Sequence, residues 1–491
     1  MAQTRLPPPA TSLTHRPGRA GTLRRQPARE PSARTYARSL PVVPVRARGL
    51  TIEGADGRRY LDCLSGGGAL ALGHNHPVVL EAIRAVLDSG APLQVPDLAT
   101  PVQEAFADEL FATLPRGLAD SARIRFCGPA ATDAMADAYR LVRAATGRDG
   151  LLALADGGLV EGVPEAALAD EPDARDVLDV PGLWVARLTF PQAFPQGHES
   201  PAGSTSATGC PLGDVRIENT GPTGRPISDV HRDIPLPAGL VVEPVLGDGV
   251  VPLPDDRLRR LRDITAARAV PLIADEAWTG AGRTGAFWAV EHSGVVPDVM
   301  VLSRAIGGSL PLAVIVHRDD LGARPRHRDE AAAFQGNQLA MAAGTATLRH
   351  IRENGLDRRA AVLGARMLER LRRLAREHEC VADVRGKGLM IGIEVTDPEA
   401  GSASVPGAGP VSGADVPAPS RRASSAIALA EDVQRECLRR GLIVGLSDRR
   451  PPVIRLLPPL TLTDEQAEAV LDRLSDAVAA ASRTVRRHPA P

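Results

Sequence analysis

Short apolar segments that alternate with helical ones restrict the fold of this sequence more than any other feature. Each is rich in Val, Leu, Ile and Ala and is shorter than an ordinary helix. They lie at residues 151–155, 183–188, 238–245, 270–277, 298–303 and 312–317. Strands that are apolar throughout and are joined by helices form a mostly parallel sheet with helices on both faces. The sequence therefore predicts an α/β protein built around such a sheet.

The order of these elements predicts two domains after an N-terminal segment. The segment spans 34–75 and contains a short β-meander, since β-branched runs there are separated by Gly-Ala-Asp-Gly. The large domain spans 76–335 and includes a helix predicted over 131–146. A smaller α+β domain spans 336–482 and ends in a helix that Thr463 caps, with Gln466 at the capping-box position.

Four stretches have a composition that is typical of disorder. The tail at 1–33 is rich in Pro and Arg, and a short tail closes the chain at 483–491. Residues 191–226 and 397–425 are rich in Gly, Pro and Ser and lie inside the large and the small domain. Such segments bury too little apolar surface to order themselves, so we predict two tails and two flexible inserts.

Overall composition excludes several classes of protein. Lys and Arg number 58 against 59 for Asp and Glu, so the charge balance favours neither nucleic acid nor an anionic membrane as a partner. No apolar run is long enough for a transmembrane helix, and the basic N-terminus lacks the apolar core of a secretory signal. The five cysteines are far apart and form no CxxC pair, so we expect reduced thiols and a cytoplasmic location.

Several motifs occur together and in one order along the chain. They are RTYARSLP (34–41), YLDCLSGGGALALGHNHP (60–77), DLATPVQEAF (97–106), FCGPAATDA (126–134), IADEAWTGAGRTGAFWAVEHSGVVPDV (273–299), LSRAIGGSLPLAV (302–314), FQGNQLAMAAGTATL (334–348) and IRLLPPLTLT (454–463). This set resembles the class III, fold-type I aminotransferases that use pyridoxal 5'-phosphate, and within them the diaminobutyrate–2-oxoglutarate aminotransferases. The resemblance implies a large and a small domain, a homodimer or larger homo-oligomer, and small amino-acid and 2-oxo-acid ligands.

The resemblance also assigns residues to the coenzyme. Asp275, at the end of a predicted strand, stands where a carboxylate keeps the pyridine nitrogen protonated; a helix-capping role is the alternative. Ala131 and Thr132 stand where backbone N–H groups at a helix start bind the phosphate, although an ordinary turn would contain the same residues. Trp278 replaces a Gln beside the coenzyme 3'-oxygen, and Ala333 replaces a Thr that the other subunit contributes to the phosphate.

The lysine position of the family holds Arg304 in this sequence. The family lysine forms the Schiff base with the coenzyme and then moves a proton, and both tasks need a neutral amine. A guanidinium stays protonated and is a poor nucleophile and base. The sequence contains a single lysine, Lys387, which lies in a strand pair of the small domain. We therefore expect pyridoxal 5'-phosphate to bind without a covalent link, if it binds.

The substrate side of the motif set is better preserved than the coenzyme side. Arg455 matches the arginine that binds the 2-oxoglutarate carboxylate, and Asp248 stands where a Glu masks that arginine between half-reactions. A surface ion pair is the alternative explanation of these two residues. On the coenzyme side, Leu159 and Val160 replace the aromatic-His pair that stacks on the pyridine ring, and Leu246 replaces a Gln.

Three hypotheses follow from these residues. The first is a catalytically degenerate member of the diaminobutyrate–2-oxoglutarate aminotransferases, which acts as a non-catalytic partner of an active paralogue or as a ligand-binding homologue. The second is an active transaminase that moves the terminal amine of L-2,4-diaminobutyrate to and from 2-oxoglutarate. The third is a structural or regulatory protein with an empty pocket. Because several losses lie at one site, the first and third are favoured.

Overall fold

The computed structural model describes most of the chain that was predicted to be ordered. The described residues are 40–95, 98–154, 185–188, 236–322, 336–398, 421–447 and 452–487. The predicted tail at 1–33 and insert at 191–226 lie outside them, as does most of the predicted insert at 397–425.

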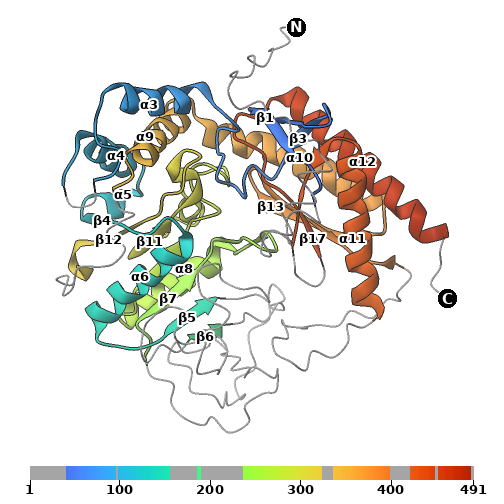
Figure 1. The fold of residues 1–491 in the computed structure, drawn as a ribbon. Coiled ribbons are helices and arrows are strands. Elements are labelled where there is room, and N and C mark those ends of the chain that lie inside the picture. The colour runs from blue at the N-terminus through green and yellow to red at the C-terminus, as the bar shows by residue number, and fades with distance from the viewer. Residues whose placement is uncertain are drawn as a thin grey trace, which may run out of the picture.

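A seven-stranded sheet forms the centre of the large domain, as predicted (Figure 1). Its spatial order is β4-β12-β11-β10-β7-β5-β6. The strands are β4 (Ala122–Phe126), β12 (Val314–Arg318), β11 (Val299–Leu302), β10 (Leu272–Asp275), β7 (Gly239–Val242), β5 (Leu151–Leu154) and β6 (Val185–Leu188). Strand β12 is antiparallel to both β11 and β4, and the other pairs are parallel. Strand β4 was not predicted, because its sequence ARIRF alternates arginine with apolar residues.

Helices cover both faces of this sheet because alternate strand residues point to opposite sides. Helix α6 (Ala131–Thr146) packs Tyr139 and Val142 in one apolar cluster with Ile273 of β10. Helix α8 (Asp255–Ala267) packs its leucines against Leu272, the preceding residue of the same strand, in a separate cluster. The two-sided burial explains why the strands are apolar throughout.

A layer of three helices covers the edge region near β4. Helix α9 (Gln338–Glu353) lies against α3 (Pro77–Asp88) and α4 (Pro101–Phe111), at the upper left of Figure 1. A short helix, α5 (Arg116–Ala119), leads into β4. The remaining short elements near the sheet are η3 (Ala289–His292), η4 (Arg304–Gly307), η5 (Asp319–Leu321), β8 (Val245–Leu246) and β9 (Val251–Pro252).

The C-terminal part forms the predicted smaller α+β unit, at the right of Figure 1. Its sheet has the order β13-β14-β17-β16, with β13 (Val381–Lys387), β14 (Met390–Val395), β17 (Val453–Leu456) and β16 (Gly445–Leu446). Helices α10 (Leu356–Glu377), α11 (Arg421–Arg439) and α12 (Asp464–Arg487) belong to this part of the chain. The predicted capping box of α12 is confirmed, since Thr463 and Gln466 exchange hydrogen bonds of 3.1 and 3.2 Å.

Two boundaries and one strand pairing differ from the predicted ones. Helix α11 begins at Arg421, so the end of the stretch 397–425 is helical rather than loop. Helix α12 continues to Arg487, into the predicted closing tail, because its Ala-rich end keeps good helix propensity. The N-terminal meander, β1 (Pro44–Arg48), β2 (Thr51–Gly54) and β3 (Arg59–Asp62), is joined by β15 (Leu442–Ile443) from the C-terminal part. No described helix is long and apolar enough to cross a bilayer.

Candidate active site

The carboxyl ends of neighbouring strands bring the first two site residues to one edge of the sheet. Strand β10 ends at Asp275, and the parallel strand β11 ends at Leu302, two residues before Arg304. Asp275 is 3% exposed, and its Oδ1 accepts a hydrogen bond of 3.0 Å from the backbone N–H of Ala277. The edge is where open α/β sheets place their ligands.

Arg304 has a strained backbone and a fixed guanidinium. Its φ is +58°, in the left-handed region that non-glycine residues avoid. Its Nη1 donates a hydrogen bond of 3.0 Å to the carbonyl oxygen of Gly67, and its Cζ lies 3.9 Å from the centre of the Trp278 ring. A cation at this distance over an indole face is attracted by the ring. Strained residues of this kind are held by their surroundings and cluster at functional sites.

Glycines surround Trp278 and allow backbone to approach its ring. A Cβ on Gly247 would lie 2.7 Å from Trp278 Cδ1, so only glycine fits there. On Gly67 and Gly68, which have φ of +66° and +87°, a Cβ would lie 3.8 and 3.7 Å from the ring. Trp278 is therefore a platform that is held in place, rather than a loose surface side chain.

Arg455 of β17 approaches the same ring from the C-terminal part. Its Cζ lies 5.4 Å from the ring centre of Trp278, and its Nη1 lies 3.6 Å from Oδ1 of Asp248. Its contacts with the carbonyl oxygens of Gly247 and Leu446 measure 3.4 and 3.5 Å, which is long for hydrogen bonds. Its Nε is buried and has no hydrogen-bond partner among the described residues. The structure thus brings together Arg304, Trp278 and Arg455.

The predicted phosphate turn lies at the same edge of the sheet. Strand β4 is parallel to β11, because both are antiparallel to β12, so the turn after β4 faces the same way. Helix α6 begins at Ala131, which is buried, whereas Thr132 is exposed. Asp133 folds back over the turn, and its Oδ2 accepts a hydrogen bond of 3.0 Å from Ala130 N–H. That carboxylate occupies the N–H group of Ala130, the residue that precedes the two predicted phosphate donors.

Three predicted positions lie outside the described residues: Leu159, Val160 and Ala333. Leu246 is described and is buried in β8.

Lys387, the chain's single lysine, is engaged elsewhere. It lies at the end of β13, and its Nζ forms a salt bridge of 2.7 Å with Oδ1 of Asp255, the first residue of α8. Because Asp255 engages its Nζ, we do not expect Lys387 to supply an amine at the position of Arg304.

Glu276, the residue after Asp275, stabilises the turn that carries Trp278. The side chain is fully buried, and burial raises its pKa to about 7 although hydrogen bonds act in the opposite direction. The carboxylate accepts hydrogen bonds from Thr279 Oγ1 and, at 2.9 Å, from Val290 N–H. These bonds tie the turn that carries Trp278 to the η3 region.

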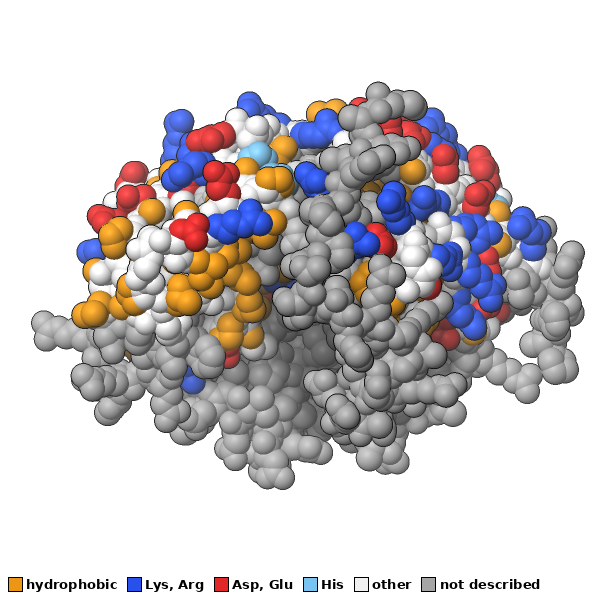
Figure 2. Space-filling view, turned by 45° about the horizontal axis from the view of Figure 1, so that its top comes forward, with side chains coloured by type: hydrophobic (Ala, Val, Ile, Leu, Met, Phe, Trp, Pro, Cys, Tyr) orange, Lys and Arg blue, Asp and Glu red, His pale blue; other side chains and the backbone are white. Residues whose placement is uncertain are grey.

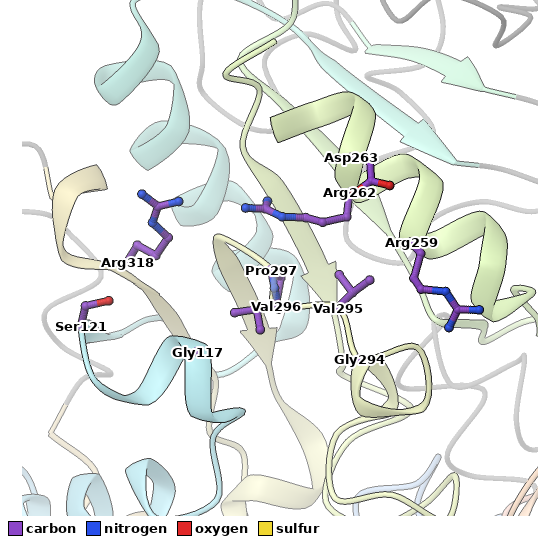
Figure 3. Close-up of a pocket in the computed structure, with 10 residues that line it drawn as sticks. All are labelled: Gly117, Ser121, Arg259, Arg262, Asp263, Gly294, Val295, Val296, Pro297 and Arg318. Atoms are coloured by element: carbon purple, nitrogen blue, oxygen red, sulfur yellow. The ribbon is translucent and has the colours of Figure 1, made fainter. Parts of the chain in front are cut away.

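The structure also contains a cavity of about 560 Å³ at the opposite edge of the sheet (Figure 3). Pro297 and Asp298 precede β11 there, and Arg318 ends the antiparallel strand β12. Arg262 reaches across the cavity from α8, and Arg259 of the same helix also lines it. Arg262 pairs with Asp298, and Arg318 pairs with both Asp298 and Asp320, so two carboxylates balance the two arginines. This cavity is distinct from the site at Asp275, and nothing in it indicates chemistry.

The sequence pointed to several residues of this candidate site but not to how they meet. It singled out Trp278, Arg304 and Arg455 separately, as two substitutions and one retained arginine. It did not predict the stacking of Arg304 on Trp278 or the contact with Gly67. The run of glycines at 66–68 was the only signal, since glycine marks close approach of backbone.

Comparisons with known proteins agree with this architecture. The family model "Aminotransferase class-III" matches residues 32–157 and 227–478. The chain is 40% identical over 475 residues to the diaminobutyrate–2-oxoglutarate aminotransferase of Rhizobium meliloti, covering 95% of this chain and 93% of that protein. It is 34% identical to the enzyme of the same name from Haemophilus influenzae, covering 94% and 96%.

Solved structures share the fold. The ornithine aminotransferase of Toxoplasma gondii superposes with a TM-score of 0.67 at 21% identity, covering 92% of this chain and 95% of that one. The acetylornithine aminotransferase of Elizabethkingia anophelis gives a TM-score of 0.63 at 21% identity, covering 90% and 94%. The fold, the ordered motifs and these matches together show that the chain belongs to the class III aminotransferases, a fold-type I family that depends on pyridoxal 5'-phosphate.

Proposed function

We propose that this protein is a catalytically degenerate member of the diaminobutyrate–2-oxoglutarate aminotransferases that keeps the fold and binds small ligands without transamination. The stacking of Arg304 on Trp278 is the observation that carries the proposal. A guanidinium that is held by an indole face and a backbone carbonyl cannot act as the neutral amine that the family chemistry requires.

The residues present do not fit a covalently bound coenzyme. Asp275 is buried at the carboxyl end of β10 and suits a protonated ring nitrogen. However, no lysine side chain is at hand, because the only one in the sequence is paired with Asp255. The guanidinium of Arg304 and the indole of Trp278 also occupy space where a smaller Gln and an amine are expected. The proposal therefore involves no step through the coenzyme.

The spectrum of the protein with added pyridoxal 5'-phosphate tests this proposal. We expect coenzyme binding, where it occurs, to be reversible on dialysis and unaffected by borohydride, because no aldimine can be reduced. We also expect no glutamate to form from 2-oxoglutarate and L-2,4-diaminobutyrate. An aldimine absorbance band that borohydride reduces irreversibly, together with steady turnover, would show that the degenerate assignment is wrong.

The alternative is an active transaminase with a chemistry that does not use lysine. The pairing of Arg455 with Asp248, at 3.6 Å, favours it, since this geometry suits an arginine that is masked until the acid substrate arrives. Turnover in the same assay would favour this alternative. Its substrates would be L-2,4-diaminobutyrate and 2-oxoglutarate.

We also propose that the protein is a homodimer or larger homo-oligomer, as class III aminotransferases typically are; a heteromer with an active paralogue is the other assembly. Large apolar side chains are exposed at Leu93 and Leu98, and hydrophobic side chains gather on one part of the surface in Figure 2. Backbone hydrogen bonds of 3.0 Å join Leu93 to Gln338 and Val95 to Gly336. These bonds tie the exposed segment to the start of α9, whose motif GNQLAMAAG resembles a family segment that reaches across to the other subunit. Sedimentation of monomer alone at micromolar concentration would contradict this.

A further inference from the structure

We infer that Arg304 is a ligand-binding residue, and that Arg304 and Arg455 together bind the two carboxylates of one small dicarboxylic acid beside Trp278. This inference rests on the proposed function, because a working transaminase would need the place of Arg304 for its amine. It assigns Arg304 a binding role in place of the Schiff-base chemistry of the family lysine.

The geometry of the two arginines supports a two-point receptor. Their guanidinium carbons lie 3.9 and 5.4 Å from the same ring centre, so they are no further apart than the sum of those distances. Both guanidinium groups are therefore within reach of one dicarboxylic acid of four or five carbons. Planar guanidinium groups match carboxylates with paired hydrogen bonds, which makes arginine the residue suited to this task.

The two arginines are held differently, and both arrangements favour an anion. Arg304 is oriented by a hydrogen bond of 3.0 Å to Gly67 and by its stacking on Trp278. A receptor that is ordered before binding loses little entropy when the ligand arrives. Arg455 makes only long contacts, and its buried Nε lacks a partner among the described residues. A buried donor without a partner is costly, so a carboxylate there would stabilise it.

Carboxylates near the site limit what it can bind. Asp248 lies 3.6 Å from Arg455, and it must yield when an anion binds there. Its side chain is about a third exposed, so solvent is within its reach when an anion takes its place. Asp275 is fixed by the turn that it caps and stays buried. Once Asp248 turns away, the two guanidinium groups favour a ligand with two separated negative groups over one with a single charge.

Calorimetric titration of the full chain, without coenzyme, tests this inference with glutarate as the probe. Butyrate is the control with a single carboxylate on a chain of similar length. Sulfate is the control with the same charge as glutarate but without two separated anionic groups. We expect glutarate to bind at least about tenfold more tightly than either, since each charge-assisted pair adds to the affinity. Equal binding of butyrate or sulfate would overturn the two-point receptor.

Substitutions separate the two anchors. We expect Arg304→Met and Arg455→Met each to weaken glutarate at least about tenfold and to leave butyrate less affected. The glutarate affinity of Arg304→Lys should lie between those of the wild type and Arg304→Met, because lysine keeps the charge but lacks the planar pair of donors. Arg372→Met, on an exposed position of α10, is the matched control and should change nothing.

The outcomes distinguish this inference from the proposed function. Unchanged glutarate affinity in Arg304→Met, with the variant's melting temperature unchanged, would overturn the role of Arg304 while the protein remains inactive. Turnover by the wild type with coenzyme would instead overturn the proposed function. Circular dichroism of each variant shows whether it folds, and Arg304→Lys serves as the second variant if Arg304→Met does not.

Discussion

The guanidinium of Arg304 lies over the indole ring of Trp278, with its Cζ 3.9 Å from the ring centre. Both residues depart from the motif of the family, and the structure shows that the two departures contact each other. An arginine in place of lysine leaves a half-buried cation, and a tryptophan in place of glutamine supplies a face that stabilises it. The two substitutions therefore make physical sense as a pair.

A double-mutant cycle measures this pairing. We expect Trp278→Leu and Arg304→Leu to be non-additive in the free energy of unfolding, with a coupling of roughly 0.5–2 kcal/mol, because the contact is half-buried. The cycle of Trp278→Leu with Arg455→Leu is the control, and its coupling should be smaller since that cation lies 5.4 Å away. Additive effects in the first cycle would mean that the stacking contributes nothing to stability.

Glu276 predicts a pH dependence of stability. Burial raises its pKa in the folded protein from 4.5 to about 7, so the folded state holds this proton more tightly than the unfolded state does. Its contribution is fully present below about pH 4.5 and is lost as the pH rises through 7, by up to about 3 kcal/mol. Glu276→Gln should flatten the unfolding free energy across this window, since the amide can keep both hydrogen bonds.

Chemical denaturation at a series of pH values between 4.5 and 8 provides the measurement for Glu276→Gln. The exposed Glu379→Gln is the matched control and should follow the wild-type curve. A Glu276→Gln curve parallel to that of the wild type would show that Glu276 does not titrate as described.

Gly364 in α10 predicts an exception to helix propensity. Alanine in an exposed helix position is usually about 1 kcal/mol more favourable than glycine. A Cβ on Gly364, however, would lie 1.9 Å from the carbonyl oxygen of Gly388, in the turn between β13 and β14. We expect Gly364→Ala to destabilise the protein by about 1–3 kcal/mol, because neither backbone can move freely.

Thermal and denaturant unfolding of Gly364→Ala can be set beside those of Ala365→Gly. The latter residue is exposed on the same helix, so its substitution reports the propensity term alone. A stabilised Gly364→Ala variant would contradict the close packing of α10 on this turn.

Local sequence patterns predicted those elements of the fold whose ends are set by their own residues. Helix α6 begins at Ala131 and ends at Thr146 as predicted, because its apolar periodicity and the following Gly147 agree. Strand β10 ends at Asp275 because four apolar residues give way to a carboxylate. By contrast, the antiparallel direction of β12 depends on which neighbours it meets, and no local pattern encodes that.

The candidate site was predictable as a set of positions but not as a geometry. The motif order identified Asp275, Arg304 and Arg455. The convergence of Arg304 and Arg455 on Trp278 arises from contacts between segments that are far apart in the chain, such as Arg304 with Gly67. Such contacts depend on how β11, the N-terminal segment and β17 pack, which sequence spacing does not show.

Restoring lysine at position 304 gives the decisive prediction about catalysis. We expect no appreciable transamination of L-2,4-diaminobutyrate by the wild type, since general acid–base help alone contributes roughly a hundred- to ten-thousand-fold. Arg304→Lys returns the nucleophile but leaves Trp278 unchanged, and slack positioning can cost about another hundredfold. We therefore expect the single variant to stay far below about 10 per second, a typical enzyme turnover number.

The measurement is glutamate formation from 2-oxoglutarate by the wild type, by Arg304→Lys, and by Arg304→Lys combined with Trp278→Gln and Ala333→Thr. Arg372→Lys, on the exposed face of α10, controls for the mere addition of a lysine. The combined variant should exceed the single one, because it also returns the polar partner beside the coenzyme oxygen and the phosphate donor that the family motif carries. Ordinary turnover by Arg304→Lys alone would show that Trp278 and Ala333 do not limit catalysis, and ordinary turnover by the wild type would show that Arg304 is not disabling.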